Sequence, residues 1–204
     1  MGEPGSRKRG AYKSSEQVRA RLLEAAMTEF ATHGFEGAST RAIARRAGAH
    51  QPQINYHFES KEALWYAVMD AFMEEIDEFM PDPGTSIREG VEEMIRGFVR
   101  FSAARPELNR IMSSEAAEPS DRLTWLIDTH IRPRYVLYRA AWETLQADGV
   151  GDHVPIDLVW HLMVGAASLI HSNAAETEAL VGITPSDPET IEAHADAMVR
   201  LFLG

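Results

Sequence analysis

Apolar residues recur every three or four positions along most of this chain, and that spacing is the period of an α-helix. The first such stripe consists of Val18, Leu22, Ala25, Ala26 and Phe30. No run of alternating apolar and polar residues, which would indicate a β-strand, can be found between the helical segments. The pattern therefore predicts an all-α fold.

Proline and glycine divide the helical segments, and the cluster Pro-Asp-Pro-Gly at 81–84 is the clearest boundary. Four regions follow from these divisions: a basic disordered arm at 1–13, a compact domain at 14–61, a connecting helix at 62–80 and a larger helical domain at 81–204. In the last region, Ser86 opens one predicted helix, and others are predicted at 106–112, 120–146, 155–180 and 188–203. Pro133 must kink or divide the segment 120–146.

Within the compact domain, residues 39–61 predict two short helices joined by a sharp turn. Ser39 or Thr40 can cap the first helix with its hydroxyl group. Gly48 can adopt the left-handed conformation that ends a helix, and Pro52 suits the first turn of the next. This segment therefore predicts a helix-turn-helix.

The second of these helices has an unusually polar surface. Ile54 and Phe58 would bury one edge, and the other faces carry Gln51, Gln53, Asn55, Tyr56 and His57. Asn and Gln can bond adenine with two hydrogen bonds, and Arg can do the same with guanine. In a helix-turn-helix the second helix enters the major groove of DNA. A solvated surface without a partner is the alternative, but it leaves the glycine turn and the proline start unexplained. It also leaves unexplained the cations that flank this helix: Arg41, Arg45, Arg46 and Lys61.

The distribution of charge supports a DNA-binding region, although the net charge of the chain is -11. Residues 1–61 hold 10 Lys or Arg against 6 Asp or Glu, a net of +4, and residues 62–204 hold 10 against 25, a net of -15. A basic region joined to an acidic one can present a single surface to a polyanion.

These residues also resemble a known family, the TetR-like bacterial transcriptional regulators. The resemblance covers residues 15 to about 80. It rests on the turn His33-Gly34-Phe35, on the segment Thr40-x-x-Ile43-Ala44-x-x-Ala47-Gly48 and on the ending Tyr56-His57-Phe58-x-x-Lys61-x-x-Leu64. Two positions depart from the family pattern. Asn55 replaces a Tyr that is usual on the recognition helix, and His50 replaces a small hydroxyl residue at the helix start.

The resemblance implies a three-helix DNA-binding head and a larger helical body that binds a ligand and dimerises. Thr40 and Lys61 would hold phosphates, and Tyr56 would contact the backbone or a thymine methyl group. The side chains expected to face base edges are Arg41, Gln51, Gln53, Asn55 and His57, with Pro52 at the start of the helix that carries them. A homodimer would hold two such helices about 34–36 Å apart and read a palindromic operator in double-stranded DNA.

The segment from Pro155 is apolar on two faces, which indicates a central place in the core or a subunit across from it. One stripe consists of Leu158, Leu162, Gly165 and Leu169, and the other of Trp160, Val164, Ala167 and His171. The last helix has a matching stripe of Ile191, Ala195, Met198 and Phe202. By the family resemblance, these two helices would pair with their copies in a four-helix dimer interface.

The body is also rich in aromatic and soft side chains, which suit an apolar pocket for a small organic effector. A packed core with satisfied histidines is the alternative for any single residue. The family resemblance favours a pocket, and the expected ligand-binding residues are Phe98, Phe101, Met112, Trp125, His130, Tyr138, Trp142, Trp160 and His171.

No catalytic motif is present, so we expect neither an enzyme nor a cofactor. The eight His do not fall in HExxH or a similar metal spacing, and there is no nucleophile elbow or phosphate loop. Glu115, Glu118, Asp121 and Asp128 near His130 could be drawn as a metal site, although a charged solvent face explains them as well. The absence of Cys, of a signal peptide and of a membrane-spanning stretch fits a cytoplasmic protein.

The sequence as a whole predicts a dimeric DNA-binding regulator, a repressor that a small organic effector releases from its operator. The alternative is a DNA-binding architectural or partner-regulated protein whose body is filled and binds no small molecule.

Overall fold

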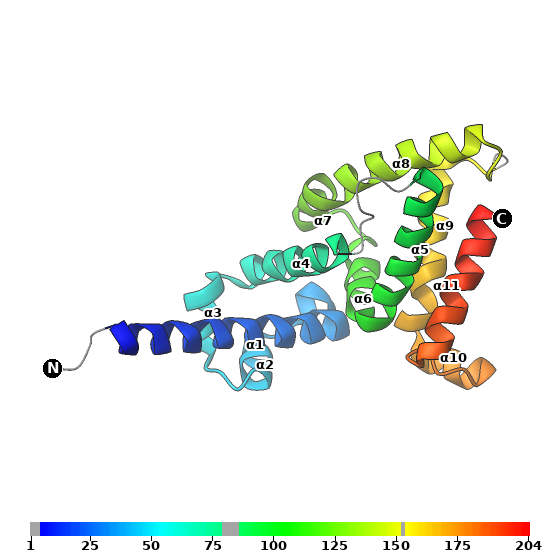
Figure 1. Cartoon of the computed structure of the whole chain (residues 1–204). Coiled ribbons are helices and arrows are strands. Elements are labelled where there is room, and N and C mark those ends of the chain that lie inside the picture. The colour runs from blue at the N-terminus through cyan, green and yellow to red at the C-terminus, as the bar shows by residue number, and fades with distance from the viewer. Residues whose placement is uncertain (1–4, 79–85, 152–153) are drawn as a thin grey trace. The chain divides into compact units, whose positions relative to one another are not determined.

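The computed structural model describes residues 5–78, 86–151 and 154–204, with side chains from residue 15 onward. Every regular element in these ranges is a helix (Figure 1), which confirms the predicted all-α fold. None of the described helices is long and apolar enough to cross a membrane.

The chain forms two compact units, Met1–Ala71 and Phe72–Gly204. The division falls inside helix α4 (Lys61–Asp77), whereas the sequence suggests a boundary at 81–84. The last turns of α4 belong to the second unit because their carboxylates bond arginines there: Glu75 pairs with Arg105 and Asp77 with Arg134. The Pro-Gly cluster itself lies outside the described residues.

The first unit contains α1 (Gly5–Gly37), α2 (Thr40–Arg46), α3 (Gln51–Phe58) and the start of α4. Helix α1 packs against α2, and α2 packs against α3. Gly34, in the predicted turn His33-Gly34-Phe35, interrupts α1 with a φ of 65° and a ψ of 178°. A left-handed φ of this kind carries little penalty in glycine, because glycine has no Cβ.

The arm expected at 1–13 differs from the structure over most of its length. Helix α1 begins at Gly5, so the backbone of residues 5–13 is helical where the sequence suggests disorder. Residues 1–4 lie outside the described residues. The segment has no apolar stripe of its own, but it continues an established helix, and extension costs far less than nucleation.

The second unit contains seven α-helices in the described residues beyond α4, together with one π-helical turn. They are α5 (Ile87–Ala104), α6 (Pro106–Glu115), α7 (Asp121–Leu126), η1 (Ile127–Ile131), α8 (Arg132–Ala147), α9 (Ile156–Ser172), α10 (Ala174–Val181) and α11 (Pro188–Leu203). Figure 1 shows α5, α9 and α11 side by side, with α8 crossing one end of this layer.

Pro133 divides the segment 120–146, as the sequence predicts. Proline has no N–H to donate, and its ring clashes with the carbonyl four residues earlier. The π-helical turn η1 ends at Ile131, so the wider backbone lies directly ahead of the proline, which occupies the first turn of α8.

The prediction of one helix over 155–180 is wrong, because Asn173 leaves the helical conformation with a φ of -107° and a ψ of 37°. Side chains compensate the carbonyls at this break. Thr177 Oγ1 donates to the carbonyl of Ile170 at 3.3 Å, and Arg110 Nε donates to that of Ser172 at 3.0 Å. These carbonyls therefore accept hydrogen bonds from side chains in place of the backbone N–H groups of a further helical turn.

The core of the second unit lies among α5, α8, α9 and α11. Its buried members are Val91, Ile95 and Val99 from α5, Tyr138, Trp142 and Leu145 from α8, Val159, Met163 and Ala167 from α9, and Ala195, Met198 and Leu203 from α11. Hydrophobic burial of this kind is the main force that holds such helices together.

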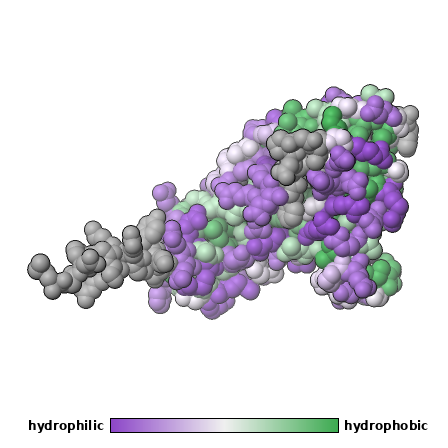
Figure 2. Space-filling view, in the orientation of Figure 1, coloured by the Kyte–Doolittle hydropathy of each residue, from purple (hydrophilic) through white to green (hydrophobic). Residues whose placement is uncertain are grey.

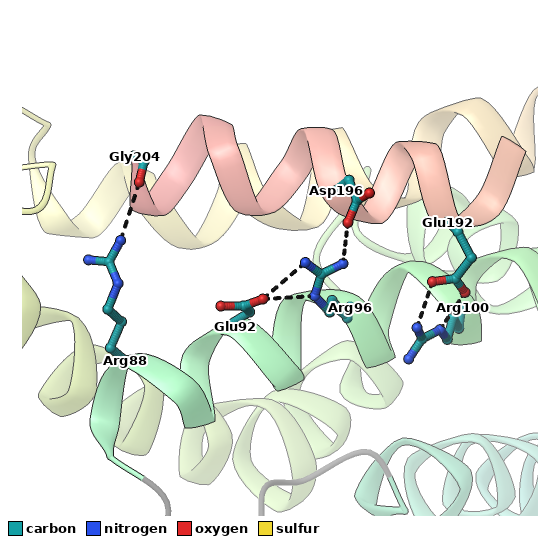
Figure 3. A network of polar contacts seen from close by, with 7 residues as sticks. All are labelled: Arg88, Glu92, Arg96, Arg100, Glu192, Asp196 and Gly204. Atoms are coloured by element: carbon teal, nitrogen blue, oxygen red, sulfur yellow. Dashed lines mark hydrogen bonds and ion pairs between the residues drawn. The ribbon is translucent and has the colours of Figure 1, made fainter. Parts of the chain in front are cut away.

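A row of polar contacts fastens α5 to α11 along their outer edge (Figure 3). Arg88 donates to the carbonyl of Leu203 at 2.6 Å, and Arg96 bonds Asp196 at 2.6 Å. Arg100 and Glu192 form a two-bond pair at 2.6 and 2.7 Å. Because these pairs are largely exposed, each contributes little stability, but together they set the register between the two helices.

Candidate functional site

Helix α1 supports the helix-turn-helix through two polar contacts. The carboxylate of Glu29 is buried, and it accepts a hydrogen bond from the backbone N–H of Ser39 at 3.3 Å. Arg21 Nε donates to the carbonyl of Ala47 at 3.0 Å. These contacts fix both ends of α2 to α1, and sequence reasoning missed them because the partners lie far apart along the chain.

The ends of α2 follow the sequence closely. Ser39 is the N-cap, and its hydroxyl accepts from the N–H of Ala42 at 3.3 Å. Gly48 has the expected left-handed φ of 61°. Thr40 is half-buried, and its hydroxyl accepts a bond from Gln51 Nε2 at 3.3 Å, which joins the start of α2 to the start of α3.

The side chain of Gln53 caps the start of α3, where His50 replaces the usual small hydroxyl residue. The backbone N–H of His50 donates to Gln53 Oε1 at 2.8 Å, so the side chain of Gln53 compensates one unpaired N–H at this end. Pro52 is exposed in the first turn. Ile54 and Phe58 are buried, as predicted for the inner edge of this helix.

The remaining α3 side chains lie on its outer faces. Gln51 and Asn55 are exposed, and Tyr56 keeps 78% of its surface accessible. His57 is half-buried and makes an edge-on contact with the Tyr56 ring, with 4.9 Å between the ring centres. Partial burial, followed by the charge of Arg19, lowers the pKa of His57. At neutral pH this imidazole is therefore uncharged and can offer both a donor and an acceptor.

Two cations expected to contact DNA have different surroundings. Arg41 is exposed near the start of α2. Lys61 is half-buried, and its Nζ donates to the carbonyls of Phe35 at 2.8 Å and Ala38 at 3.3 Å. It also lies 4.4 Å from the centre of the Phe35 ring. The ammonium group therefore neutralises the carbonyl end of α1 in the unbound protein.

The residues expected to bind an effector do not form a single group. Phe98, Tyr138, Trp142 and Trp160 belong to the core among α5, α8, α9 and α11. Phe101 is buried and stacks on Phe98, with 6.4 Å between ring centres.

The other expected effector residues lie elsewhere in the second unit. Met112 is half-buried on α6. Trp125 of α7 contacts His130 of η1 edge-on, with 5.2 Å between ring centres. His171 is buried, and its Nδ1 donates to the carbonyl of Pro185 at 3.1 Å. Its other neighbour is His194 of α11, at 3.3 Å. His171 therefore bonds the segment before α11 and lies against His194 of that helix.

A surface hollow of about 330 Å³ opens between the end of α5 and the start of α11. Ala103, Ala104 and Ile191 line it, and the Arg100–Glu192 pair lies at its edge. None of the expected effector residues contributes to it.

Two of the acidic residues near His130, Glu115 and Asp128, are engaged in ion pairs. Glu115 is buried and accepts hydrogen bonds from Ser120 and Arg122. Asp128 pairs with Arg132 at 2.9 Å. Among the described residues, no three His, Asp or Glu side chains come together as metal ligands would.

Helices α9 and α11 use their two apolar faces differently. The α9 stripe of Trp160, Val164, Ala167 and His171 faces the core of its own unit, and Leu158, Leu162 and Leu169 stay more than half exposed. On α11 the expected interface stripe of Ile191, Ala195, Met198 and Phe202 also packs into that core. Its own chain therefore covers this stripe, and α11 exposes Leu201. The pairing of α9 and α11 with a second copy stays a prediction.

Figure 2 shows both hydrophilic and hydrophobic regions on the surface of the second unit. The edge where α5 and α11 meet is hydrophilic, because it carries the ion pairs of Figure 3. Hydrophobic colour gathers over α10, whose end exposes Leu180 and Val181.

Known proteins share both the sequence and the fold. The model of bacterial regulatory proteins of the tetR family matches residues 22–68. The transcriptional regulator RutR of Escherichia coli strain K12 is 30% identical over 193 residues, which cover 89% of this chain and 87% of that protein. The repressor SCO4008 of Streptomyces coelicolor is 33% identical over 109 residues, 53% of this chain and 54% of that protein.

A solved structure of AibR in complex with isovaleryl coenzyme A and operator DNA has a TM-score of 0.73 at 20% identity. The match covers 92% of this chain and 98% of that one, and at this identity it shows a common fold. The helix-turn-helix geometry, the family model and the match to RutR over 89% of this chain agree, and this chain belongs to the tetR family of DNA-binding bacterial transcriptional regulators.

Proposed function

We propose that this protein is a ligand-responsive repressor that acts in the cytoplasm, binds a palindromic operator as a homodimer and leaves it when a small organic effector binds the second unit. One observation carries the DNA-binding part. Helix α3 is fixed by Ile54, Phe58 and the Gln53 cap, and the same helix exposes Gln51, Asn55 and Tyr56. A rigid helix with outward amide groups suits base recognition.

The apolar face left on α9 supports the dimer. Leu158, Leu162 and Leu169 are exposed at helical spacing, and Leu201 of α11 is 72% exposed. A row of leucines in contact with water is unfavourable, and a second copy of the same face would cover it. Two recognition helices held about one helical turn apart would then read both halves of a palindrome.

Control by a ligand follows from linkage between two sites. Suppose that the effector binds best to a conformation in which the two α3 helices have the wrong spacing for DNA. Bound effector then lowers the affinity for DNA by some factor, and bound DNA lowers the affinity for the effector by the same factor. The proposed transmitting elements are the segments 62–80 and 106–112, which fall on helix α4 as far as Asp77 and on helix α6. Arg105, between α5 and α6, bonds Glu75 of α4 at 2.8 and 3.0 Å.

A third helix is joined to this path by Arg134 of α8. Its guanidinium group donates to the carbonyl of Met73 at 3.1 Å, to the carbonyl of His130 at 2.8 Å and to Asp77 at 2.5 Å. One side chain thus bonds the end of α4, the π-helical turn and α8. A change in packing that moves α8 would therefore also move the end of α4, because Arg134 bonds Met73 and Asp77 there.

Selection of bound sequences from random duplex DNA, at two salt concentrations, tests the first part of the proposal. We expect a palindrome whose half-sites are about one helical turn apart, with affinity that falls steeply as salt rises. Enrichment of single half-sites would contradict the dimer. No enriched sequence at either salt would contradict base recognition altogether.

A DNA-binding architectural or partner-regulated protein is the competing function, because four of the nine residues expected to bind an effector are packed in the core and the other five lie outside that cluster. Titration calorimetry with a compound library separates the two. Compounds that bind the protein and release the selected operator support the repressor. Strong operator binding without any bound compound supports the competing function.

A further inference from the structure

Two hydrogen-bond donors are buried in the core of the second unit without an acceptor. Tyr138 is 5% exposed and Trp142 is 2% exposed. Within the described structure, neither the hydroxyl of Tyr138 nor the Nε1–H of Trp142 has a hydrogen-bond partner. Buried polar groups in folded proteins are almost always bonded, because leaving one unpaired loses its hydration without replacement. Two such groups four residues apart on one helix therefore require a physical reason.

Aromatic rings from two further helices surround the two donors. The rings of Tyr138 and Trp142 stack with 6.0 Å between their centres. Trp160 of α9 meets Tyr138 edge-on at 5.3 Å, and Phe202 of α11 meets Trp142 edge-on at 6.3 Å. A ring face is only a weak acceptor for an N–H or O–H group. The surroundings therefore supply apolar contact but no proper hydrogen bond.

Burial alone shifts the pKa of Tyr138, and no neighbouring charge contributes to the shift. Apart from the Tyr138 hydroxyl and the indole nitrogens, the described members of this core are aliphatic, aromatic or thioether groups from α5, α8, α9 and α11 and from the segment beside residue 151. Burial raises the pKa of Tyr138, so its hydroxyl stays protonated and donates at neutral pH. The indole N–H can only donate. The cluster thus offers two unpaired donors, and no charge acts on the Tyr138 hydroxyl.

We propose that Tyr138 and Trp142 are the polar anchors for the effector, and that the effector is an uncharged, planar, mostly apolar molecule with a carbonyl-type acceptor. This inference rests on the ligand-responsive function proposed above. An acceptor compensates the two donors, and a planar apolar body suits the aromatic walls. A carboxylate or phosphate would lose its hydration among residues that carry no positive charge, so the site selects against anions.

Tyr138→Phe tests the anchor because it removes the hydroxyl and keeps the ring. In the unliganded protein we expect the melting temperature to stay the same or rise, since the variant no longer buries an unpaired hydroxyl. Binding of an uncharged ligand should weaken about tenfold, the loss expected for one hydrogen bond. Tyr135→Phe is the matched control on the same helix. Its hydroxyl donates to Asp157 at the surface, at 2.9 Å, and its loss should leave ligand affinity unchanged.

The chemistry of the ligand is tested with paired probes: methyl esters, ketones and lactones of two- and three-ring aromatics, each beside the carboxylate of the same skeleton. Thermal shift and quenching of tryptophan fluorescence report binding, and release of the selected operator reports the response. We expect the uncharged members to bind and the carboxylates to fail. Tighter binding of the carboxylates, or no binding by any uncharged probe, would overturn the proposal.

The variant supplies two further contrary outcomes. A lower melting temperature of Tyr138→Phe would show that the hydroxyl already has a partner, and equal affinity of the variant and the natural chain would show that the ligand does not use it. Carboxylates that bind and release the operator would reject this ligand chemistry and keep the ligand-responsive repressor. Operator binding that no probe alters would reject this ligand chemistry and also favour the competing function.

Discussion

At the residue scale, Lys61 has a structural role in addition to its predicted contact with DNA phosphate. The family resemblance implies a phosphate contact, and the structure shows its ammonium group on the carbonyls of Phe35 and Ala38. These carbonyls lie at the end of α1, where a positive charge stabilises the helix dipole. In the unbound protein Lys61 therefore holds the last turn of α1 beside the start of α4.

Lys61→Ala should consequently lower both stability and DNA affinity. We expect a loss of about 1–2 kcal/mol in the free energy of unfolding, because two carbonyls lose a charged donor. Affinity should fall for all DNA sequences alike. Denaturant unfolding and binding at several salt concentrations measure the two effects. Arg45→Ala, which removes an exposed cation of α2, is the control and should leave stability unchanged. Unaltered stability of Lys61→Ala would assign this lysine to phosphate alone.

Gln53 and Asn55 are both expected to face bases, but only Gln53 also caps the helix. Gln53→Ala should relax specificity at one base position and also cost about 1 kcal/mol of stability through the lost cap. Asn55→Ala should relax specificity at another position with no measurable loss of stability. Selection from random DNA and thermal unfolding of both variants check this. Equal destabilisation by the two substitutions would contradict the capping role.

At the scale of elements, a pair of histidines joins α9 to α11. His171 Nδ1 donates to the carbonyl of Pro185, and His194 Nε2 donates to that of Ala166 at 3.1 Å. The two remaining ring nitrogens face each other at 3.3 Å as lone pairs. A proton between them would form a bond, but it would also place a charge in a partly buried site. Burial is the larger effect and lowers the pKa of both histidines, and the neighbouring His194 lowers that of His171 further.

The lowered pKa of both histidines determines how stability should depend on pH. The unfolded histidines bind protons near their ordinary pKa of 6.5, and the folded ones bind them only at lower pH. The stability contributed by the neutral pair is therefore complete above pH 6.5 and is lost as the pH falls through the folded pKa values. Denaturant unfolding between pH 7.5 and pH 5 should show this loss, and a variant with His171→Gln and His194→Gln should show less of it. An NMR titration that places either ring above 6.5 would show that the shared proton outweighs burial.

At the scale of the whole molecule, the exposed leucines of α9 carry the proposed dimer. Leu162→Asp introduces a charge into that face without touching the core, because Leu162 is 52% exposed. We expect monomers in light scattering, a fold unchanged in circular dichroism and loss of tight operator binding. The control is Leu137→Asp on α8, since Leu137 is 64% exposed and lies outside the proposed interface. A dimer that survives Leu162→Asp would place the interface elsewhere.

Local patterns were sufficient for most of the fold. Helical periodicity identified the segments, and Ser39, Gly48 and Pro133 marked ends that the structure confirms, because caps, left-handed turns and proline act within a few residues. The same patterns missed the break at Asn173. Distant partners such as Arg110 compensate its carbonyls, and no short window of sequence contains them.

The sequence by itself determined the fold class, the helix-turn-helix and which faces of the helices are apolar, since these depend on residue type and spacing. Only the tertiary structure decided what each face meets. It placed the α11 stripe in its own core, left the α9 leucines exposed, bonded Lys61 to the end of α1 and buried two donors of α8 without acceptors. The reason is physical: burial and hydrogen-bond partnership are properties of packed surroundings, and residues far apart in the chain supply them.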